Sequence, residues 1–281
     1  MSSMTVLVLG SGGREHALAL ACHRDPEVAA VHVAPGNPGT ASFATNHPLD
    51  PCDCDAVVSL ARGLEADLVV VGPEAPLVAG VADALRESGI DCFGPSAEAA
   101  QLEGSKAFAK EVMAAARVPT AASRSCDDAN SVSAALDEFG PPYVVKDDGL
   151  AGGKGVVVTH DRAEALAHAK RCFESDHRVV VEEYLDGPEV SLFAICDGTR
   201  ALPMQPAQDF KRVGNGGVGP NTGGMGAYTP LPWAPDDLVE TVSTTIISPT
   251  LRAMADRGTP FVGLLYVGLA LTSAGPKVVE F

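Results

Sequence analysis

The chain has 281 residues, 46% of them hydrophobic, which is enough for two domains that each bury a core. Its formal net charge of −16 disfavours a general nucleic-acid binder, because such a chain would repel a phosphate backbone. Seven scattered cysteines without a CxxC pair, no signal peptide and no apolar run that could span a bilayer predict a cytoplasmic protein with reduced thiols and no membrane partner.

Short apolar runs alternate with helical patterns over the first hundred residues. The runs are rich in β-branched residues and several end in glycine, as buried parallel strands do. This alternation predicts a doubly wound α/β domain with a parallel sheet at residues 1–103. The strands are expected at 5–10, 28–36, 67–74 and 91–96, and the helices at 14–24, 55–66 and 77–89.

The pattern changes after this domain. A connecting segment at 104–121 holds a helix that Ser105 is suited to cap. Residues 122–190 then predict an α+β module with an antiparallel sheet. Its strands are expected at 142–148, 154–159 and 178–187, and its helix at 161–175.

Residues 191–281 predict a further sheet that is incomplete. Strands are expected at 189–198, 199–210, 261–273 and 276–281, with a glycine-rich loop at 213–226 and a helix at 236–257. The sequence stops inside the last strand, and an intact domain rarely ends there. We therefore expect the chain to be truncated.

The stretch "GSGGRE" follows the first predicted strand and invites comparison with a dinucleotide-binding turn. Glu15 stands where that fingerprint requires a third glycine, and no acidic residue follows the second strand, so a nicotinamide dehydrogenase is disfavoured. Two interpretations remain. The glycines either form a tight turn, or they offer backbone N–H groups to an anion at a helix N-terminus near Arg14 and His16. We favour the anion site.

The stretch "KDDGLAGGKGVVV" at 146–158 carries glycines around Lys154. It is no Walker A loop, because Asp148 replaces the first glycine and strand residues follow the lysine. The glycines instead join two antiparallel strands, as a flap that closes over nucleotide phosphates would, and Lys146 could reach those phosphates too. The alternative is a mobile hairpin with solvent-exposed lysines.

The stretch "VVVEEYLDGPE" at 179–189 supplies groups suited to an adenosine. Glu182 could accept from the adenine amino group, and the Leu185 backbone N–H could donate to a ring nitrogen. Glu189 could accept from the ribose hydroxyls. Glu183 belongs to the same turn. The alternative is a charged hairpin turn without a ligand.

Together these features resemble the ATP-grasp superfamily. Whole segments, among them "VLGSGGREHAL", "VVGPEAPLVAGVADALRESG", "VVKDDGLAGGKGVVV" and "PNTGGMGAYTPLP", resemble the glycinamide ribonucleotide synthetase (phosphoribosylamine–glycine ligase) family along essentially the whole chain. The resemblance implies an N-terminal α/β domain followed by an ATP-grasp fold. It also implies ATP-dependent ligation of glycine to 5-phosphoribosylamine in purine biosynthesis, with Mg²⁺ or Mn²⁺.

The resemblance assigns roles to residues of every segment. The ATP phosphates would lie among Lys106, Lys146, Gly152, Gly153 and Lys154. Asp209, Lys211 and Arg212 would be catalytic, and Glu280 would bind the metal. Substrates would contact Gly223, Gly224 and Met225, and in the N-terminal domain Gly12, Gly13, Arg14, Glu15, Asn37, Gly72, Pro73 and Glu74.

Two departures bear on activity. Asp147 stands where the family commonly has alanine, so two acidic residues follow Lys146 and could weaken its attraction for phosphate. Glu280 is left as a single metal ligand, because the residue after Phe281 is absent. The remaining alternatives are another ATP-grasp carboxylate–amine ligase and a non-catalytic ATP-binding fragment. We expect a monomer.

Overall fold

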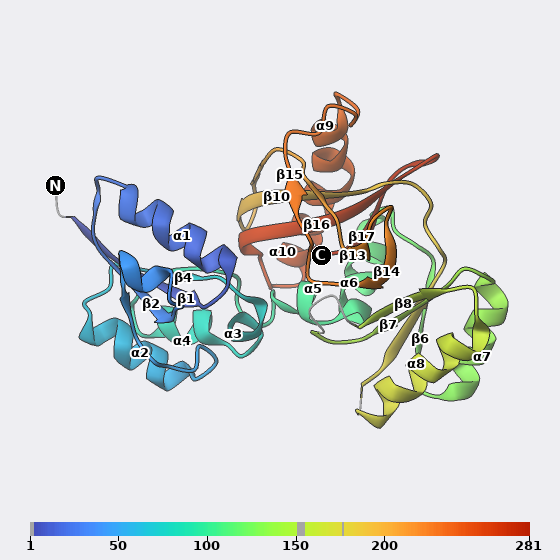
Figure 1. Cartoon of the computed structure of the whole chain (residues 1–281), viewed down its shortest axis with the longest axis horizontal. Coiled ribbons are helices and arrows are strands. Elements are labelled where there is room, and N and C mark those ends of the chain that lie inside the picture. Colours follow the sequence, from blue (N-terminus) through green and yellow to red (C-terminus); the bar gives the residue numbers. More distant parts are fainter. Residues whose placement is uncertain (1–2, 151–154, 176) are drawn as a thin grey trace. The chain divides into compact units, whose positions relative to one another are not determined.

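The computed structural model describes residues 3–150, 155–175 and 177–281. The chain divides into two compact units, Met1–Ala100 and Gln101–Phe281 (Figure 1). Each unit has sheets and hydrophobic clusters of its own.

The first unit is built on a parallel sheet in the order β3-β2-β1-β4-β5, which confirms the predicted α/β class. Its strands are β1 (Met4–Gly10), β2 (Val28–Pro35), β3 (Thr45–Asn46), β4 (Leu68–Val71) and β5 (Cys92–Phe93). Its helices are α1 (Gly13–Arg24), α2 (Cys54–Gly63), α3 (Glu74–Val78) and α4 (Val81–Glu87), with a 3₁₀ turn η1 at Thr40–Ser42.

The central strand β1 is apolar and buried from Val6 to Leu9 because helices cover both faces of its sheet. Val6 and Val8 belong to a cluster with α1, whereas Leu7 and Leu9 belong to a second cluster with α2 and α4. Figure 1 shows α1 on one side of these strands and α2 and α4 on the other. The helix predicted at 77–89 is wrong in one respect. Gly80 adopts a left-handed conformation (φ 94°) and separates α3 from α4.

The second unit begins with α5 (Gln101–Gly104) and α6 (Lys106–Ala116). An antiparallel sheet follows in the order β6-β9-β7-β8. Its strands are β6 (Ser123–Cys126), β7 (Tyr143–Asp147), β8 (Val156–Thr159) and β9 (Val179–Glu182). The pairing of β7 with β8 confirms the predicted hairpin, with Lys146 opposite Val156.

Helices α7 (Ala129–Phe139) and α8 (Arg162–Glu174) cover one face of this sheet (Figure 1). Val132 and Leu136 of α7 pack with Val145 and Val181 of the strands. Helix α7 and strand β6 were not predicted from the sequence. The helix carries a capping box, Asp128 with Ser131, and apolar residues at helical spacing that mark it in retrospect.

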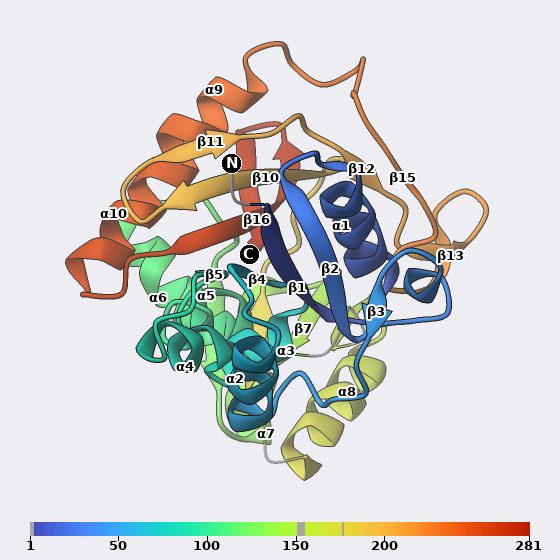
Figure 2. The same ribbon diagram turned by 90° about the vertical axis from the view of Figure 1, so that its left-hand side faces the viewer.

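A second antiparallel sheet has the order β11-β10-β16-β17. Its strands are β10 (Glu189–Asp197), β11 (Ala201–Pro203), β16 (Val262–Thr272) and β17 (Gly275–Glu280). Figure 2 shows β11, β10 and β16 side by side, with α9 (Leu238–Val242) and α10 (Ser248–Asp256) next to them. A π-helical turn at Ser243–Ile247 joins the two helices, so the helix predicted at 236–257 is continuous but not regular.

The glycine-rich loop predicted at 213–226 contains more structure than expected. Strand β13 (Arg212–Gly214) pairs with β14 (Val218–Asn221), and β12 (Gln208–Asp209) pairs with β15 (Ala227–Tyr228). The strand predicted at 199–210 is correspondingly reduced to β11 and β12. These small hairpins hold Asp209, Lys211 and Arg212 in place.

All seven cysteines lie within the described ranges and are free thiols. Across those same ranges, no helix has both the length and the apolar character needed to cross a bilayer.

Candidate functional site

The start of the glycine loop is fastened to the N-terminus of α6. Ser105 caps the helix as predicted, accepting from the Phe108 N–H at 3.1 Å. The Asp148 carboxylate accepts from the Ala107 N–H at 3.1 Å, and Lys106 donates to the Gly149 carbonyl at 2.9 Å. Burial lowers the pKa of Lys106, while the Glu280 carboxylate raises it in part. These contacts hold the start of the loop against the N-terminus of α6.

Lys146 is buried at the end of β7 and reaches across to two other elements. Its ammonium lies 2.9 Å from Glu182 Oε2 and donates to the Val279 carbonyl at 2.8 Å. These contacts tie the β7–β9 pair to β17, the strand that ends at Glu280.

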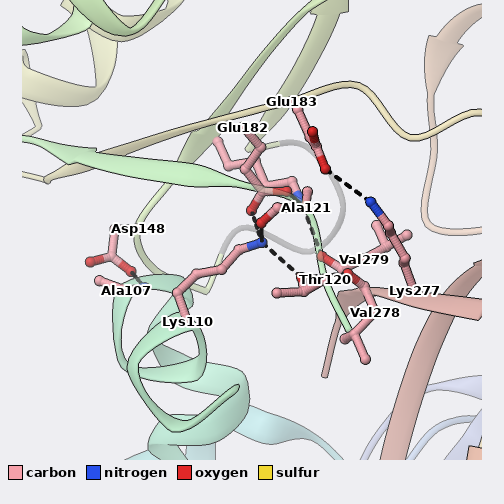
Figure 3. Close-up of polar contacts among 11 residues, drawn as sticks. Ala107, Lys110, Thr120, Ala121, Asp148, Glu182, Glu183, Lys277, Val278 and Val279 are labelled. Atoms are coloured by element: carbon pink, nitrogen blue, oxygen red, sulfur yellow. Dashed lines mark hydrogen bonds and ion pairs between the residues drawn. The ribbon is translucent and has the colours of Figure 1, made fainter. Parts of the chain in front are cut away.

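The Glu182 carboxylate has partners other than the predicted adenine amino group. The Lys146 ammonium lies 2.9 Å from one oxygen. Lys110, shown with Glu182 in Figure 3, lies 3.2 Å from the other. Lysines thus engage both oxygens of this carboxylate in the absence of a nucleotide. Sequence reasoning missed Lys110, although Lys106 and Lys110 stand four residues apart on one helix, a spacing that places them on the same face.

Glu183 forms a second connection between the same parts of the unit. Its carboxylate lies 3.1 Å from Lys277 of β17, as Figure 3 shows. Burial acts to raise the pKa of Glu183, but hydrogen bonding to the Ala122 backbone and the charge of Lys277 hold it below its ordinary value. Lys277 was also missed from the sequence. Leu185 lies in the segment that leads from here into β10.

Glu280 faces several cations. Lys211 lies 3.1 Å from Glu280 Oε1, and 3.4 Å from Glu189 Oε2. Burial would raise the pKa of Glu280, but Lys211, Lys146 and Lys106 together lower it. Burial acts to lower the pKa of Lys211, but the Glu280 and Glu189 carboxylates raise it above its ordinary value. Glu189, predicted to hold a ribose, thus lies at the Lys211 ammonium.

The strand register places further polar groups beside Glu280. Gly268 of β16 lies between Glu280 on β17 and Ser191 on β10. A Cβ at Gly268 would meet the Tyr266 hydroxyl at 2.9 Å and Glu280 Cγ at 3.1 Å, so both side chains occupy the space that glycine leaves open. Burial raises the pKa of Tyr266. Tyr266 could not be singled out from the sequence, because it stands within an otherwise apolar strand.

The segment around Asp209 surrounds the same region. A Cβ at Gly224 would lie 2.9 Å from Asp209 Oδ1, so the absence of a side chain there lets the two segments approach. Arg212 donates to the Gly219 carbonyl at 2.8 Å and thereby holds its own hairpin. Met225 is exposed, and Gly223 has open space beside it.

A small cavity of about 40 Å³ lies between α5, α6, the end of β9 and the end of β17. Lys106, Lys110, Glu182 and Glu280 line it together with the apolar side chains of Leu102 and Met113. Since nucleotide-sized pockets measure roughly 300 Å³ or more, a nucleotide could enter here only if the surrounding side chains moved apart. Gly152, Gly153 and Lys154, the other residues predicted to bind phosphates, lie outside the described residues.

In the first unit, the predicted substrate residues meet at the carboxyl edge of the parallel sheet. Arg14 donates to the Gly72 carbonyl at 2.6 Å and to Glu74 Oε1 at 3.1 Å. The Gly12 N–H donates to the Glu15 carboxylate at 2.6 Å. Glu15 therefore engages this one N–H and caps α1, and the anion site at the other N–H groups of the turn stays a prediction.

The remaining glycines of this edge fit around Glu15. A Cβ at Gly10 or Gly72 would overlap the Glu15 side chain, so glycine is required for this close approach. Asn37 donates to the Ser11 carbonyl at 3.0 Å and accepts from the Gly39 and Thr40 N–H groups. Gly13 opens α1 and Pro73 precedes α3.

Comparison with known proteins finds a matching family model for each of the two units. A family model described as phosphoribosylglycinamide synthetase, N domain, matches residues 4–103, and the ATP-grasp (A) domain model of the same family matches residues 104–281. The chain belongs to the phosphoribosylglycinamide synthetase family. This membership was predicted from the sequence motifs, and the two family models confirm it.

Relatives in this family are similar over nearly the whole chain. The phosphoribosylamine–glycine ligase of Streptomyces coelicolor is 63% identical over 278 residues, which cover 99% of this chain and 66% of the relative. The ligase of Mycobacterium leprae is 59% identical, with 99% and 67% covered. The chain thus spans about two thirds of the length of the curated relatives it matches.

Solved structures show the same fold. A phosphoribosylamine–glycine ligase from Thermotoga maritima superposes with a TM-score of 0.85 at 32% identity, covering 98% of this chain and 68% of that one. The biotin carboxylase domain of a Hydrogenobacter thermophilus 2-oxoglutarate carboxylase, crystallised with ADP, has a TM-score of 0.78 at 16% identity, covering 100% of this chain and 64% of that one. At that identity the likeness concerns the fold alone.

Proposed function

We propose that the chain carries the ATP-dependent ligation of glycine to 5-phosphoribosylamine, giving glycinamide ribonucleotide, ADP and phosphate in purine biosynthesis. The relatives named phosphoribosylamine–glycine ligase support this reaction. The observation that carries the proposal is the gathering of three lysines at the end of β17. Lys211 lies 3.1 Å from Glu280 Oε1, Lys146 donates to the Val279 carbonyl, and Lys106 lines the same cavity as Glu280.

The reaction brings two anions together, the γ-phosphate of ATP and the carboxylate of glycine. The bond between the γ-phosphorus and its bridging oxygen breaks, ADP leaves, and glycyl phosphate forms. The sugar amine then attacks the acyl carbon, a C–N bond forms, phosphate leaves and the nitrogen gives up a proton. Fixed cations lower the repulsion in both steps, because they face the charge that moves.

The described residues fit these roles as follows. Lys106 and Lys146 would face the ATP phosphates, and the segment from Glu182 to Glu189, with the backbone of Leu185, would receive the adenosine. Lys211, Arg212 and Asp209 would hold glycine and the transferred phosphate. We assign residues 122–190 to a lid subdomain, 191–281 to a central subdomain, and the Arg14–Glu74 cluster of the first unit to the sugar phosphate.

A divalent metal, Mg²⁺ or Mn²⁺, fits Glu280. Magnesium is commonly held by one or two carboxylates plus substrate phosphates, so a single glutamate beside the phosphate site suffices. No group of three or more acidic, histidine or cysteine side chains that could hold a metal occurs among the described residues, and this agrees with a site completed by substrate. When bound, the metal would neutralise phosphate charge.

The experiment mixes the protein with ATP, Mg²⁺, glycine and phosphoribosylamine and measures ADP. We expect sustained ADP formation, beyond a single turnover, only when both other substrates are present, and a loss of at least roughly 100-fold in its rate in Lys211→Met. Lys170→Met is the matched control, because that lysine is 77% exposed and pairs only with Glu174 among the described residues.

Other outcomes point to other functions. Sustained ADP formation without phosphoribosylamine would indicate another ATP-grasp carboxylate–amine ligase. ATP binding with no turnover would indicate a nucleotide-binding chain that does not catalyse. A monomeric state and a cytoplasmic location remain predictions from the sequence, which sedimentation and cell fractionation would test.

A further inference from the structure

Three buried charges form a connected group next to the cavity. The Lys110, Glu182 and Lys146 side chains are 11%, 4% and 4% exposed. Buried charges are tolerated when they are paired and hydrogen-bonded, and removing one partner leaves another uncompensated. The group lies between α6, the lid strands β7 and β9, and strand β17, as the sticks in Figure 3 show for Lys110, Glu182 and Val279.

Lys110 has no donor left for a ligand. A lysine ammonium has three N–H donors. Those of Lys110 are taken by Glu182 Oε1 at 3.2 Å, Thr120 Oγ1 at 2.9 Å and the Ala121 carbonyl at 3.0 Å. Thr120 is fixed in turn, because it donates to the Val278 carbonyl at 2.7 Å. Lys110 therefore acts through its contacts with other protein groups.

Lys146 differs from Lys110 in this respect. Glu182 Oε2 and the Val279 carbonyl accept two of its N–H groups, and within the described part of the chain the third has no acceptor. That donor is available to a ligand. Its direction is set by the other two bonds, and one of those depends on where Glu182 is held.

The charges of the group also depend on Lys110. Two ammoniums and one carboxylate leave one positive charge in excess. Without Lys110, Glu182 would pair with Lys146 alone, at 2.9 Å. The negative charge of Glu182 would then nearly cancel the attraction of Lys146 for a nearby anion. Lys110 thus affects both the position and the effective charge of Lys146.

We propose that Lys110 is a positioning residue of the nucleotide site, which holds the Glu182 carboxylate so that Lys146 stays oriented and cationic toward the phosphates of ATP. The inference rests on the proposed function, in which Lys146 faces those phosphates. It assigns Glu182 to the support of Lys146, in place of the contact with the adenine amino group that the sequence suggested.

The test compares ATP with adenosine, because Lys146 is proposed to act on phosphates and not on the base. Dissociation constants are measured by calorimetry for the wild type, Lys110→Met, Lys110→Arg and Lys146→Met. We expect Lys110→Met to weaken ATP binding roughly tenfold, the scale of one charge-assisted hydrogen bond, and adenosine binding less than about twofold. Lys110→Arg should recover most of the loss.

Val112→Ala is the matched control for stability. Val112 is fully buried in the same helix and carries no charge, so its truncation lowers the melting temperature and should leave ATP affinity unchanged. Equal ATP affinity in the wild type and Lys110→Met would overturn the proposal. A parallel loss of ATP and adenosine binding would overturn it as well, because that result indicates a general distortion of the site.

A second readout needs no nucleotide. In protein labelled with ¹⁵N-lysine, the Nζ signal of Lys146 should shift in Lys110→Met and stay in place in Val112→Ala. If Lys110→Met does not fold, Thr120→Val takes its place. This variant removes one acceptor of Lys110, keeps every charge and should produce a smaller shift of the Lys146 signal. An unmoved Lys146 signal in the folded variants would refute the positioning role.

Failure of the proposed function would look different. If Lys146→Met bound ATP as tightly as the wild type, the assignment of Lys146 to the phosphates would be wrong. The Nζ signals would then still decide whether Lys110 positions Lys146.

Discussion

Asp147 and Asp148 follow Lys146 directly, yet neither carboxylate is directed at it. Asp147 lies 2.8 Å from His177 Nδ1, and Asp148 binds the start of α6. Successive side chains of a strand point to opposite faces, so Asp147 leaves β7 on the side away from Lys146. The strand geometry keeps these acids out of direct contact with Lys146, whereas their charges still act on Lys106, so the weakening of phosphate attraction stays a prediction.

At the scale of single residues, Glu182→Gln is expected to destabilise the second unit strongly. The change leaves the buried ammoniums of Lys110 and Lys146 without their carboxylate, and breaking a buried pair costs about 3 kcal/mol or more. Urea unfolding followed by the fluorescence of Trp233, the single tryptophan of the chain, measures this.

Glu138→Gln is the control for that measurement. Glu138 pairs with Arg124 but is 45% exposed, so its loss should cost less than about 1 kcal/mol. Equal unfolding midpoints for the two variants would show that the buried group contributes nothing to stability.

The cysteines should differ widely in reactivity. Burial raises the pKa of Cys196 to about 11, so at pH 8 only about one thiol in a thousand is the reactive thiolate. Cys52 is exposed. We expect a disulfide reagent at pH 8 to label Cys52 first and Cys196 only after denaturation, as peptide mass spectrometry would show. Rapid labelling of Cys196 in the folded protein would contradict the packing of β10.

At the scale of elements, the strands of the two units differ in how their side chains are buried. The apolar run of β1 is buried on both faces, whereas β10 alternates between a buried face and the exposed face that carries Ser191 and Glu189. The hairpin of β7 and β8 was predictable because only a glycine loop separates the two runs. Helix α7 was not predicted, because the residues that precede it are typical of a loop and its capping residue Asp128 stands among them.

The cap of α7 should make its stability depend on pH. Hydrogen bonds from the backbone N–H and the hydroxyl of Ser131 lower the pKa of Asp128 below its ordinary value. A lowered carboxylate pKa stabilises the folded state above the unfolded value of about 3.8, and this stabilisation is lost as the pH falls through the lower folded value.

Asp128→Ala should therefore lower the melting temperature at pH 7, and its effect should shrink toward pH 3. Asp128→Asn keeps an acceptor and should behave more mildly, with less dependence on pH. Melting curves of the three proteins between pH 7 and 3 measure this. A penalty for Asp128→Ala that persists unchanged at pH 3 would exclude the charged cap as its cause.

At the scale of the whole molecule, an acidic chain gathers its lysines at one place. Of its seven lysines, Lys106, Lys110, Lys146, Lys211 and Lys277 all contact the glutamates or backbone of the candidate site. A protein of charge −16 repels free phosphate in general, so a local cationic cluster is needed to attract a triphosphate.

The first unit is expected to fold without the second. Its parallel sheet has hydrophobic clusters on both faces that consist of residues from that unit alone. A polypeptide of residues 1–100 should show helical circular dichroism and a cooperative urea transition. A disordered spectrum for this fragment would show that its two cores need the rest of the chain.

The sequence by itself determined the fold class, the family, the β7–β8 hairpin and most of the charged residues of the site. Periodicity, glycine spacing and motif order depend on neighbours along the chain, and such local signals can be read directly. Tertiary structure alone decided the partners of those residues. Lys110, Lys277 and Tyr266 join the site through contacts between strands and helices far apart in sequence, and Glu182 binds lysines from two such elements. A side chain's partner is set by packing across the fold, and no local pattern specifies it.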